Sequence, residues 1–403
     1  MKRPRICLRA TAGGSGWSSL PGDLLEQISG YLSTDADHLR IHQVCAHWRA
    51  CTSSPTALRP WILALRTDRS RPPPPARYHS VWLPRAHLPR EVDIGAPPAG
   101  LPYFLGATRG WLALADDARS PTRLALWDPA SGAEVRLPPL AGVIRVFLSA
   151  DPLASPDWMA VASQRYDYDD MGAQKPFFWR PGDAAWSVLC DRPTTGVGTL
   201  AFHRGRVYCL DWRQVLVVCD PNLGPAAVQT RDISGHMNRI CGCPRSHRVR
   251  GAHMVSCAGD LLLVVLRDGI GRRHSSSFAE IYRLGPAPGP GRRLEIGDRV
   301  TDLGDHSLFI VRGESLALSA REFPAIKRNR VYGVAVDGNY YSRSHGRKLP
   351  DWAFVFDLGS DTLEEIPYPG EHIRDDGSDW QALSWLCPRG PFKKQKQQRL
   401  TEK

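Results

Sequence analysis

The sequence predicts an α+β multidomain protein: a small all-α region at the N-terminus followed by an all-β propeller of five to seven blades, with six as the expected number. The first reason is length, because 403 residues exceed what one hydrophobic core usually supports. The second is composition, since 36 Gly, 34 Pro and 13 Trp are typical of short strands joined by tight turns. The third is RTDRSRPPPPAR at residues 66–77, where four consecutive prolines separate a helical pattern from a strand-like one.

Before the prolines, WSSLPGDLLEQISGYL at residues 17–32 predicts one amphipathic helix. Pro21 suits the first turn of a helix, where its missing N–H is not needed. The apolar side chains recur at helical spacing and form one face: Leu24, Leu25, Ile28, Tyr31 and Leu32.

A second amphipathic helix is expected within residues 38–53, and a short third helix at residues 58–66. The second helix carries its apolar side chains at Ile41, Val44, Cys45 and Trp48. Helices of this size bury little surface alone, so the region needs a partner or a neighbouring domain.

After the prolines, a two-strand unit recurs. Its first strand follows a Gly-x or Asn-x pair, and its second strand ends in Asp-Pro or a Gly-rich turn. The first strand is expected at 109–116, 204–211, 258–268 and 329–338, and the second with its turn at 123–139, 177–189, 215–224, 278–295 and 352–368. This repeat indicates propeller blades, two stacked β-sandwiches being the alternative. The longer gaps leave room for loops or for an extra strand set at 306–320.

The net charge of +11 lies at the two ends of the chain. Residues 1–90 carry +8 and residues 389–403 carry +5, whereas residues 91–388 carry −2. The predicted propeller is therefore nearly neutral, and we expect no specific nucleic-acid partner. The segment KKQKQQR at 393–399 is either a nuclear address or a solvated tail, the latter being the simpler interpretation.

The sequence predicts a protein of the cytoplasm, the nucleus or both, with no membrane partner. The longest apolar run is LLLVVL at 261–266, far shorter than a membrane span. The first 16 residues lack the apolar segment of a secretory signal, and we expect residues 1–16 and 389–403 to be disordered tails.

The sequence predicts neither a metal site nor a cofactor. Of the ten cysteines, Cys45 lies on an apolar helix face and the others are scattered, so reduced core thiols are expected. One cluster has potential ligands close together: Cys241, Cys243, His247, His253 and Cys257. Its closest pair is C-x-C rather than a zinc-type C-x2–4-C, so a basic loop is the simpler interpretation.

The motifs of common enzymes are absent, so we predict a protein without catalytic residues. No phosphate-binding loop, H-E-x-x-H helix or G-x-S-x-G elbow is present. The acidic run YDYDDM at 166–171 lacks the spacing of a calcium loop, which leaves a solvated loop as the expectation. Trp179 and Trp186 are expected to pack between blades rather than to line a ligand groove.

The N-terminal region resembles an F-box. The family pattern of Leu-Pro-x-(Asp/Glu)-Leu, Ile, Leu, Arg, Val-Cys and Trp-Arg is matched at Leu20, Pro21, Asp23, Leu24, Ile28, Leu32, Arg40, Val44, Cys45, Trp48 and Arg49. This resemblance covers about 40 residues in both type and spacing. It implies a helical module that docks onto the Skp adaptor of cullin–RING ubiquitin ligases.

The region from about 78 to 370 resembles a plant F-box-associated propeller, known as DUF 295 or the KIB-type β-propeller. The resemblance rests on RGWLALAD, WDPASGAEVRLPPL, FHRGRVYCLD, AGDLLLVVLRD and LGDHSLFIVRGESLALSA. It departs from the family after Asn329, where the usual Cys and aromatic are missing, and in the loop at 241–253.

Together the two resemblances imply a substrate-recruiting subunit of a Skp–cullin–F-box (SCF) ligase, whose propeller binds a target protein that the sequence does not identify. The expected parts are F-box helices at 17–65, a linker at 66–77 and a propeller at 78–388. The expected adaptor-binding residues are Leu20, Pro21, Leu24, Leu25, Ile28, Leu32, Val44, Cys45, Trp48 and Arg49. The alternative is a ligase-independent scaffold in which the helices only cap the propeller.

Overall fold

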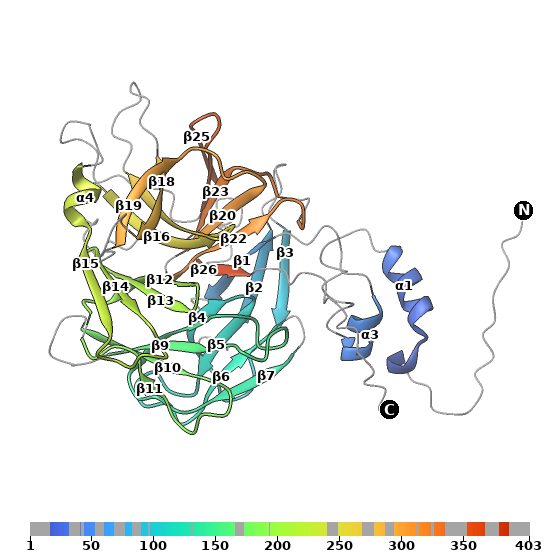
Figure 1. Ribbon diagram of the computed structural model, residues 1–403. Helices are drawn as coiled ribbons and strands as arrows, with labels where there is room; N and C mark the ends of the chain where they lie inside the picture. Colours follow the sequence, from blue (N-terminus) through green and yellow to red (C-terminus); the bar gives the residue numbers. More distant parts are fainter. Residues whose placement is uncertain are drawn as a thin grey trace, which may run out of the picture. The chain divides into compact units, whose positions relative to one another are not determined.

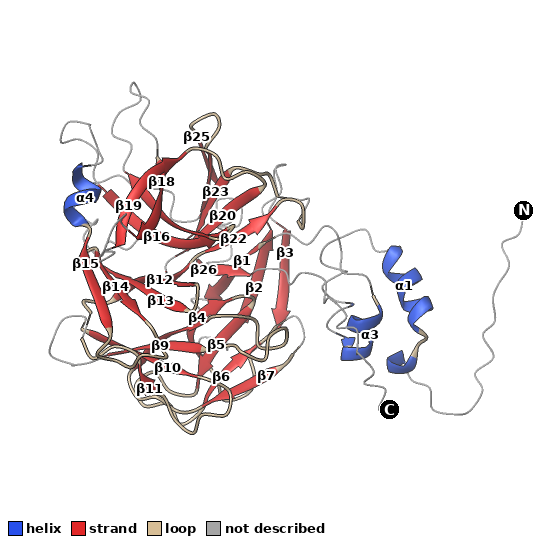
Figure 2. Ribbon diagram, viewed as in Figure 1, coloured by secondary structure: helices blue, strands red, loops and turns tan. Residues whose placement is uncertain are grey.

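The computed structural model (Figure 1) describes residues 17–31, 41, 44–52, 60–67, 77–82, 90–95, 97–129, 132–165, 173–192, 194–239, 249–267, 278–286, 294–311, 313–323, 326–334, 353–366 and 379–386. The chain forms two compact units, residues 1–55 and 56–403. Figure 2 shows that the described parts of the first unit are helical, whereas the second consists almost entirely of strands.

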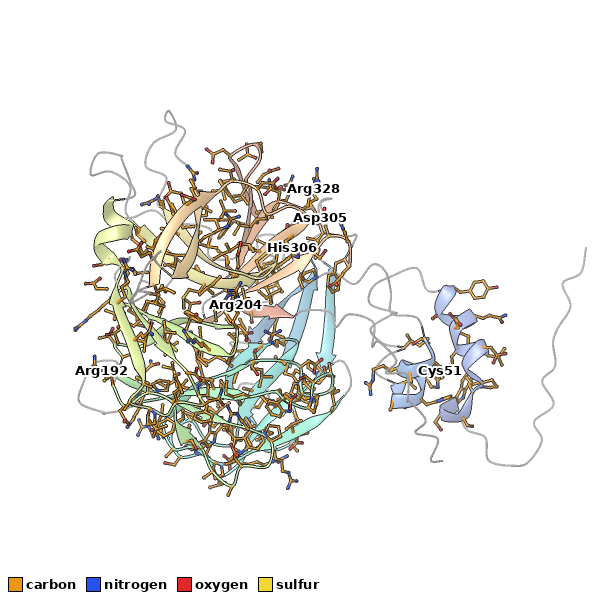
Figure 3. All side chains as sticks on the ribbon, in the orientation of Figure 1. Cys51, Arg192, Arg204, Asp305, His306 and Arg328 are labelled. Carbon is orange, nitrogen blue, oxygen red and sulfur yellow. The ribbon has the colours of Figure 1, made fainter. Side chains whose placement is uncertain are left out.

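The first unit contains the short 3-10 helix η1 (Trp17–Ser19) and the helices α1 (Gly22–Gly30) and α3 (Ala46–Cys51). The helices expected within 17–32 and 38–53 are thus confirmed over these residues. The Cys45 Sγ caps α3 by accepting a hydrogen bond from the Trp48 N–H at 3.5 Å. Gly22 lies against Cys51, which Figure 3 labels: a Cβ at Gly22 would stand 3.1 Å from the Cys51 Sγ. This contact sets how closely the two helices approach.

The third helix expected at 58–66 is wrong, because residues Trp61–Thr67 form strand β1. β1 pairs antiparallel with β2 (Arg77–Trp82) on one side and with β26 (Asp379–Leu386) on the other. Ile62 and Leu63 are buried in this sheet. The second unit therefore begins well before residue 78, the start that the sequence suggested, and part of the expected linker is strand.

Within its described residues, the second unit contains six sheets, which falls in the range of five to seven blades that the sequence suggested. The first has the order β26-β1-β2-β3, with β3 at Arg90–Gly95. The second is β4 (Tyr103–Thr108), β5 (Trp111–Ala115), β6 (Leu124–Trp127) and β7 (Glu134–Leu137). The third is β8 (Val143–Leu148), β9 (Ala160–Arg165), β10 (Gln174–Trp179) and β11 (Ser187–Val188).

The fourth sheet contains β12 (Val197–His203), β13 (Arg206–Asp211), β14 (Val215–Cys219) and β15 (Val228–Asp232). Helix α4 (Ser234–Arg239) follows it. The fifth contains β16 (Val249–Cys257), β17 (Asp260–Arg267), β18 (Ala279–Pro286) and β19 (Leu294–Val300). The sixth has the order β22-β20-β23-β24-β25, at Leu316–Ser319, His306–Val311, Arg330–Val334, Ala353–Asp357 and Thr362–Ile366.

Apolar clusters between successive sheets hold the ring together. One cluster joins the second and third sheets, and it contains Trp158 and Trp179 in edge-to-face contact at 5.4 Å. Further clusters join the third sheet to the fourth, the fourth to the fifth, the fifth to the sixth and the sixth to the first. Trp186 packs against the first of these clusters and donates its Nε1–H to the Pro138 carbonyl at 2.7 Å, so the inter-blade positions expected for Trp179 and Trp186 are confirmed.

The recurring Gly-x pairs of the sequence are tight turns between the first two strands of a sheet. Arg109 and Gly110 have φ values of 50° and 84°, and Arg204 and Gly205 have 49° and 75°. Two successive residues with positive φ form the type of hairpin turn whose twist matches the twist of the strands. The second position is glycine because glycine adopts a positive φ without strain. Arg204, labelled in Figure 3, also donates its Nη2–H to the Gly259 carbonyl of the fifth sheet at 3.0 Å. The turn thus ties neighbouring sheets together.

A two-residue strand, β21 (Gly313–Glu314), follows β20 of the sixth sheet along the chain but pairs in parallel with β12, so it is the fifth strand of the fourth sheet. It brings the buried Glu314 to Thr108, whose hydroxyl donates to the Glu314 Oε2. The Arg109 Nε lies 3.7 Å from the Glu314 Oε1. A cross-link among the second, fourth and sixth sheets was not expected from the sequence, although it falls within the extra strand set considered at 306–320.

Candidate functional sites

The helical unit carries an exposed apolar face. Its large side chains have exposed fractions of 75% for Trp17, 43% for Leu24, 37% for Ile28, 88% for Tyr31 and 52% for Val44. We call these five residues the apolar face. Five large apolar side chains exposed within so few residues are unusual on a folded surface and are typical of a protein-interaction site.

The neighbouring side of α1, which carries Leu25, forms the small core of the unit. Leu25, Ile41 and Trp48 are buried together, and Leu20, Cys45 and Cys51 pack against them. The Trp48 Nε1–H donates to the Trp17 carbonyl at 2.6 Å, and the His47 Nε2 lies 2.7 Å from the Leu20 carbonyl. These bonds fix the segment before α1 onto α3.

The structure therefore divides the predicted adaptor-binding residues into two groups. Pro21, Leu24, Ile28 and Val44 are exposed, whereas Leu20, Cys45 and Arg49 are half-buried. Leu25 and Trp48 lie in the core of the unit, so they stabilise the helices that carry the apolar face but are not part of that face. Leu32 lies outside the described residues. Trp17 and Tyr31 were not among the predicted contacts, although Tyr31 shares the helical spacing of the apolar residues.

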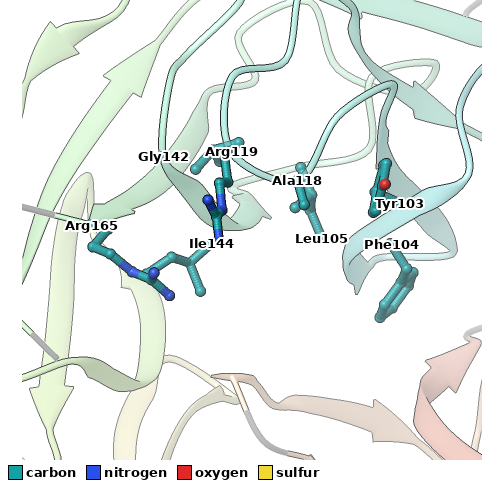
Figure 4. Close-up of a pocket in the computed structure, with 9 residues that line it drawn as sticks. Tyr103, Phe104, Leu105, Ala118, Arg119, Gly142, Ile144 and Arg165 are labelled. Atoms are coloured by element: carbon teal, nitrogen blue, oxygen red, sulfur yellow. The ribbon is translucent and has the colours of Figure 1, made fainter. Parts of the chain in front are cut away.

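The propeller carries a pocket of about 310 Å³ between its second and third sheets. Figure 4 shows residues from four places lining it, the start of β4, the loop after β5, the start of β8 and the end of β9. The lining residues are Tyr103, Phe104, Leu105, Ala118, Arg119, Gly142, Val143, Ile144 and Arg165.

Both inner strands at the pocket are irregular. The pairing of β4 with β5 shifts at Leu105, and the pairing of β8 with β9 shifts at Ile144. β-bulges of this kind bend a strand and redirect side chains, and they are common next to binding sites. The same shift recurs at Gly198 in β12 and at Arg250 in β16.

Several buried titratable groups in the propeller have shifted pKa values. Burial raises the pKa of Glu314, an effect that Arg109 and Thr108 oppose. Burial lowers the pKa of His253 to about 4, against the influence of the Val311 carbonyl. Burial also raises the pKa of Cys257 to about 11, as expected for a core thiol rather than a nucleophile.

The cysteine–histidine cluster considered as a metal site is only partly described. His253 and Cys257 both lie in β16 and are buried, whereas Cys241, Cys243 and His247 lie outside the described residues, as does the acidic run at 166–171. Within the described ranges, no group of three or more His, Cys, Asp or Glu side chains is placed to hold a metal ion. None of the helices in those ranges has the length and apolar character to span a membrane.

Two family models match the chain. The F-box-like model matches residues 17–59, and the KIB1-4 beta-propeller model matches residues 77–357. The second match covers most of the chain and almost all of the strands described above.

Two individual relatives each match only part of this chain. The chain is 30% identical to the Arabidopsis thaliana "F-box protein At2g05970" over 91 residues, which are 23% of this chain and 21% of the relative. It is 30% identical to the Arabidopsis thaliana "Putative F-box protein At1g65770" over 169 residues, 41% of this chain and 42% of the relative. The matched parts thus span less than half of either relative. Among solved structures, the β-propeller domain of Myceliophteria thermophila Cps50 (Swd1) covers 72% of this chain and 84% of its own at 11% identity, with a TM-score of 0.35.

Proposed function

Because this chain belongs to the KIB1-4 beta-propeller family and carries an F-box-like segment ahead of its propeller, we propose that it is the substrate-recruiting F-box subunit of an SCF ubiquitin ligase. In this function the helical unit binds the Skp adaptor and, through it, the cullin–RING ligase. The propeller binds the target protein.

The observation that carries this proposal is the apolar face of the helical unit. α1 divides its apolar side chains between two sides, with Leu25 in the core and Leu24 and Ile28 exposed. An amphipathic helix with such a second apolar side fits a hydrophobic groove of a partner. Trp17 and Tyr31 add large aromatic side chains at the two ends of the face, and aromatic residues are common among energetic hot spots of interfaces.

The proposed mechanism requires no catalytic group from this chain. Holding a target and a ubiquitin-loaded enzyme in one complex converts an encounter in solution into an intramolecular one, which raises the effective concentration of the reacting groups. This chain must supply two binding surfaces, one for the adaptor and one for the target protein.

Substitution of the apolar face tests this function. Ile28→Asp and Val44→Asp each place a carboxylate on the face without touching the core, whereas Trp48→Ala would disrupt the unit itself. The control is Glu26→Gln, which also changes the charge by one unit and is exposed on the side of α1 away from Leu24 and Ile28. Loss of a hot-spot side chain costs roughly 2 kcal/mol or more, so Ile28→Asp should weaken adaptor binding about 30-fold while Glu26→Gln leaves it unchanged.

Co-purification of the full chain with the Skp adaptor measures this effect. Equal recovery of the adaptor with the wild-type chain and with both face variants, or no recovery with any of them, would exclude the proposed function. Those results would favour the alternative, a ligase-independent scaffold whose helices only cap the propeller.

A further inference from the structure

Two side chains of α3 hold the segment that precedes α1. The Trp48 Nε1–H donates to the Trp17 carbonyl at 2.6 Å, and the His47 Nε2 lies 2.7 Å from the Leu20 carbonyl. Because a carbonyl oxygen only accepts hydrogen bonds, the His47 Nε2 carries the proton of this bond and is its donor. The backbone from residue 17 to residue 20 is therefore fixed at both of its ends.

The His47 ring also contacts its own helix. Its Nδ1 lies 3.6 Å from the Sγ of Cys51, which Figure 3 labels one turn further along α3. In the neutral ring Nε2 carries the only N–H, so Nδ1 is the acceptor that faces the thiol. His47 thus connects α3 to the Leu20 carbonyl while its side chain remains exposed.

The fixed segment presents one large side chain to solvent. Trp17 is 75% exposed, although its own carbonyl is bonded to Trp48. Leu20, at the other end of the segment, packs against the core of the unit instead. Tryptophan side chains are buried over most of their surface on average, and tryptophan is among the residues enriched in interface hot spots. An exposed tryptophan on a fixed backbone is therefore typical of an interface anchor.

Fixing this backbone in advance favours association with a partner. A side chain on a segment that is not fixed has to be ordered when the partner binds, and that ordering costs free energy. The hydrogen bonds from His47 and Trp48 remove this cost for Trp17 in the free protein. Of the two donors, His47 is the one whose replacement leaves the core intact, because Trp48 is 9% exposed and lies in that core.

We propose that His47 is a positioning residue for adaptor binding, which holds the segment before α1 so that Trp17 contacts the Skp adaptor. Neither residue belongs to the F-box pattern, whose first position is Leu20. The adaptor is the partner because η1 leads directly into α1, which carries the exposed Leu24 and Ile28. This inference rests on the proposed function, since it assigns two further residues to the adaptor-binding site.

Isothermal titration calorimetry of the full chain with purified Skp adaptor tests the anchor. Trp17→Ala removes the indole and should weaken binding about 30-fold, the loss expected for a hot-spot side chain. The matched control is Trp212→Ala, which removes a 43% exposed tryptophan from the propeller and should leave the affinity for the adaptor unchanged.

Two substitutions of His47 test its positioning role. His47→Ala removes the donor to the Leu20 carbonyl and should weaken adaptor binding about fivefold, as expected for one lost hydrogen bond. His47→Gln supplies an amide N–H in place of the ring N–H and should restore the affinity to within about twofold of the wild-type value. Urea unfolding of both variants confirms that the chains in the titration are folded.

The double variant Trp17→Ala/His47→Ala shows whether the two residues act together. If His47 acts through Trp17, releasing the segment matters little once the indole is gone. The double variant should then bind within about twofold of Trp17→Ala alone. Independent residues would instead give losses that multiply, to about 150-fold.

Unchanged affinity of Trp17→Ala or His47→Ala, no recovery with His47→Gln, or multiplied losses in the double variant would each overturn this inference. Ile28→Asp in the same titrations separates the two proposals. If Ile28→Asp loses binding while Trp17→Ala does not, this inference is rejected and the proposed function stands. An absence of binding by the wild-type chain would reject both.

Discussion

Glu314 is a charged residue in a buried position that its neighbours in the sequence do not suggest. It lies between Gly313 and Ser315 in a two-residue strand, yet it is buried against Thr108 and near Arg109 of the second sheet. Burial raises the pKa of its carboxyl group, so the folded protein binds a proton at this position more tightly than the unfolded chain does. The consequence is a pH dependence of stability with a definite sign.

The stability contribution of Glu314 should fall as the pH rises. Well below pH 4.5, the ordinary pKa of a glutamate, Glu314 is protonated in both states. Between that value and the raised folded pKa, the unfolded state loses its proton first, so the folded state becomes less favourable. Glu314→Gln removes this titration and keeps an acceptor for the Thr108 hydroxyl.

Urea unfolding of the wild-type chain and Glu314→Gln at pH 4 and pH 7 measures the effect. The variant should gain stability relative to the wild-type chain on going from pH 4 to pH 7. A relative loss over the same range would mean that the Arg109 interaction outweighs the cost of burial. The substitution Glu134→Gln, at an exposed position paired with Arg123, serves as control.

Among the elements, β1 and α1 show what the sequence could and could not predict. The short apolar run WILALRT is compatible with either a helix or a strand, and its partner β26 lies at the other end of the chain, so local pattern alone gave the wrong element. For α1 the helix itself was predicted correctly. The sequence did not predict which of its apolar residues are buried in the core and which are exposed. Leu24 and Leu25 are adjacent in sequence and differ only in which side of α1 they occupy.

The pairing of β1 with β26 closes the first sheet, and Trp385 anchors it. Trp385 is 5% exposed, makes an edge-to-face contact with Phe309 at 5.2 Å, and donates its Nε1–H to the Ile310 carbonyl at 3.0 Å. Trp385→Ala should therefore destabilise the propeller by about 3–5 kcal/mol, the usual cost of removing a buried tryptophan.

Denaturant unfolding followed by far-ultraviolet circular dichroism tests the anchor. Leu363→Ala in β25 is the matched control, because Leu363 is 38% exposed and its truncation should change stability by less than about 0.5 kcal/mol. Similar losses for the two variants would show that closure by β26 adds little to the fold.

At the scale of the whole molecule, the repeat pattern of the sequence predicted the architecture well. The turn residues and strand pairs mark five of the six sheets found in the described residues, but they do not mark the first sheet, whose strand β1 was expected to be helical. The pocket could not be predicted, because it joins Tyr103, Arg119, Gly142 and Arg165 from four separate segments. The strand β21 could not be predicted either, because it is only two residues long and its partner β12 lies far away in the sequence.

The two units have different roles in the proposed function. The helical unit displays exposed apolar side chains, while the propeller carries a pocket between its second and third sheets. Because the units form separate contact clusters, a substitution in one should leave binding by the other intact.

The central claim is that the apolar face of the helical unit binds the Skp adaptor. Backbone hydrogen exchange of the full chain, with and without purified adaptor, tests it most directly. We expect amides of α1 (Gly22–Gly30) to exchange readily in the free protein and to become protected on addition of the adaptor, with the propeller strands unchanged. Full protection of α1 without the adaptor, or no change on its addition, would contradict the claim.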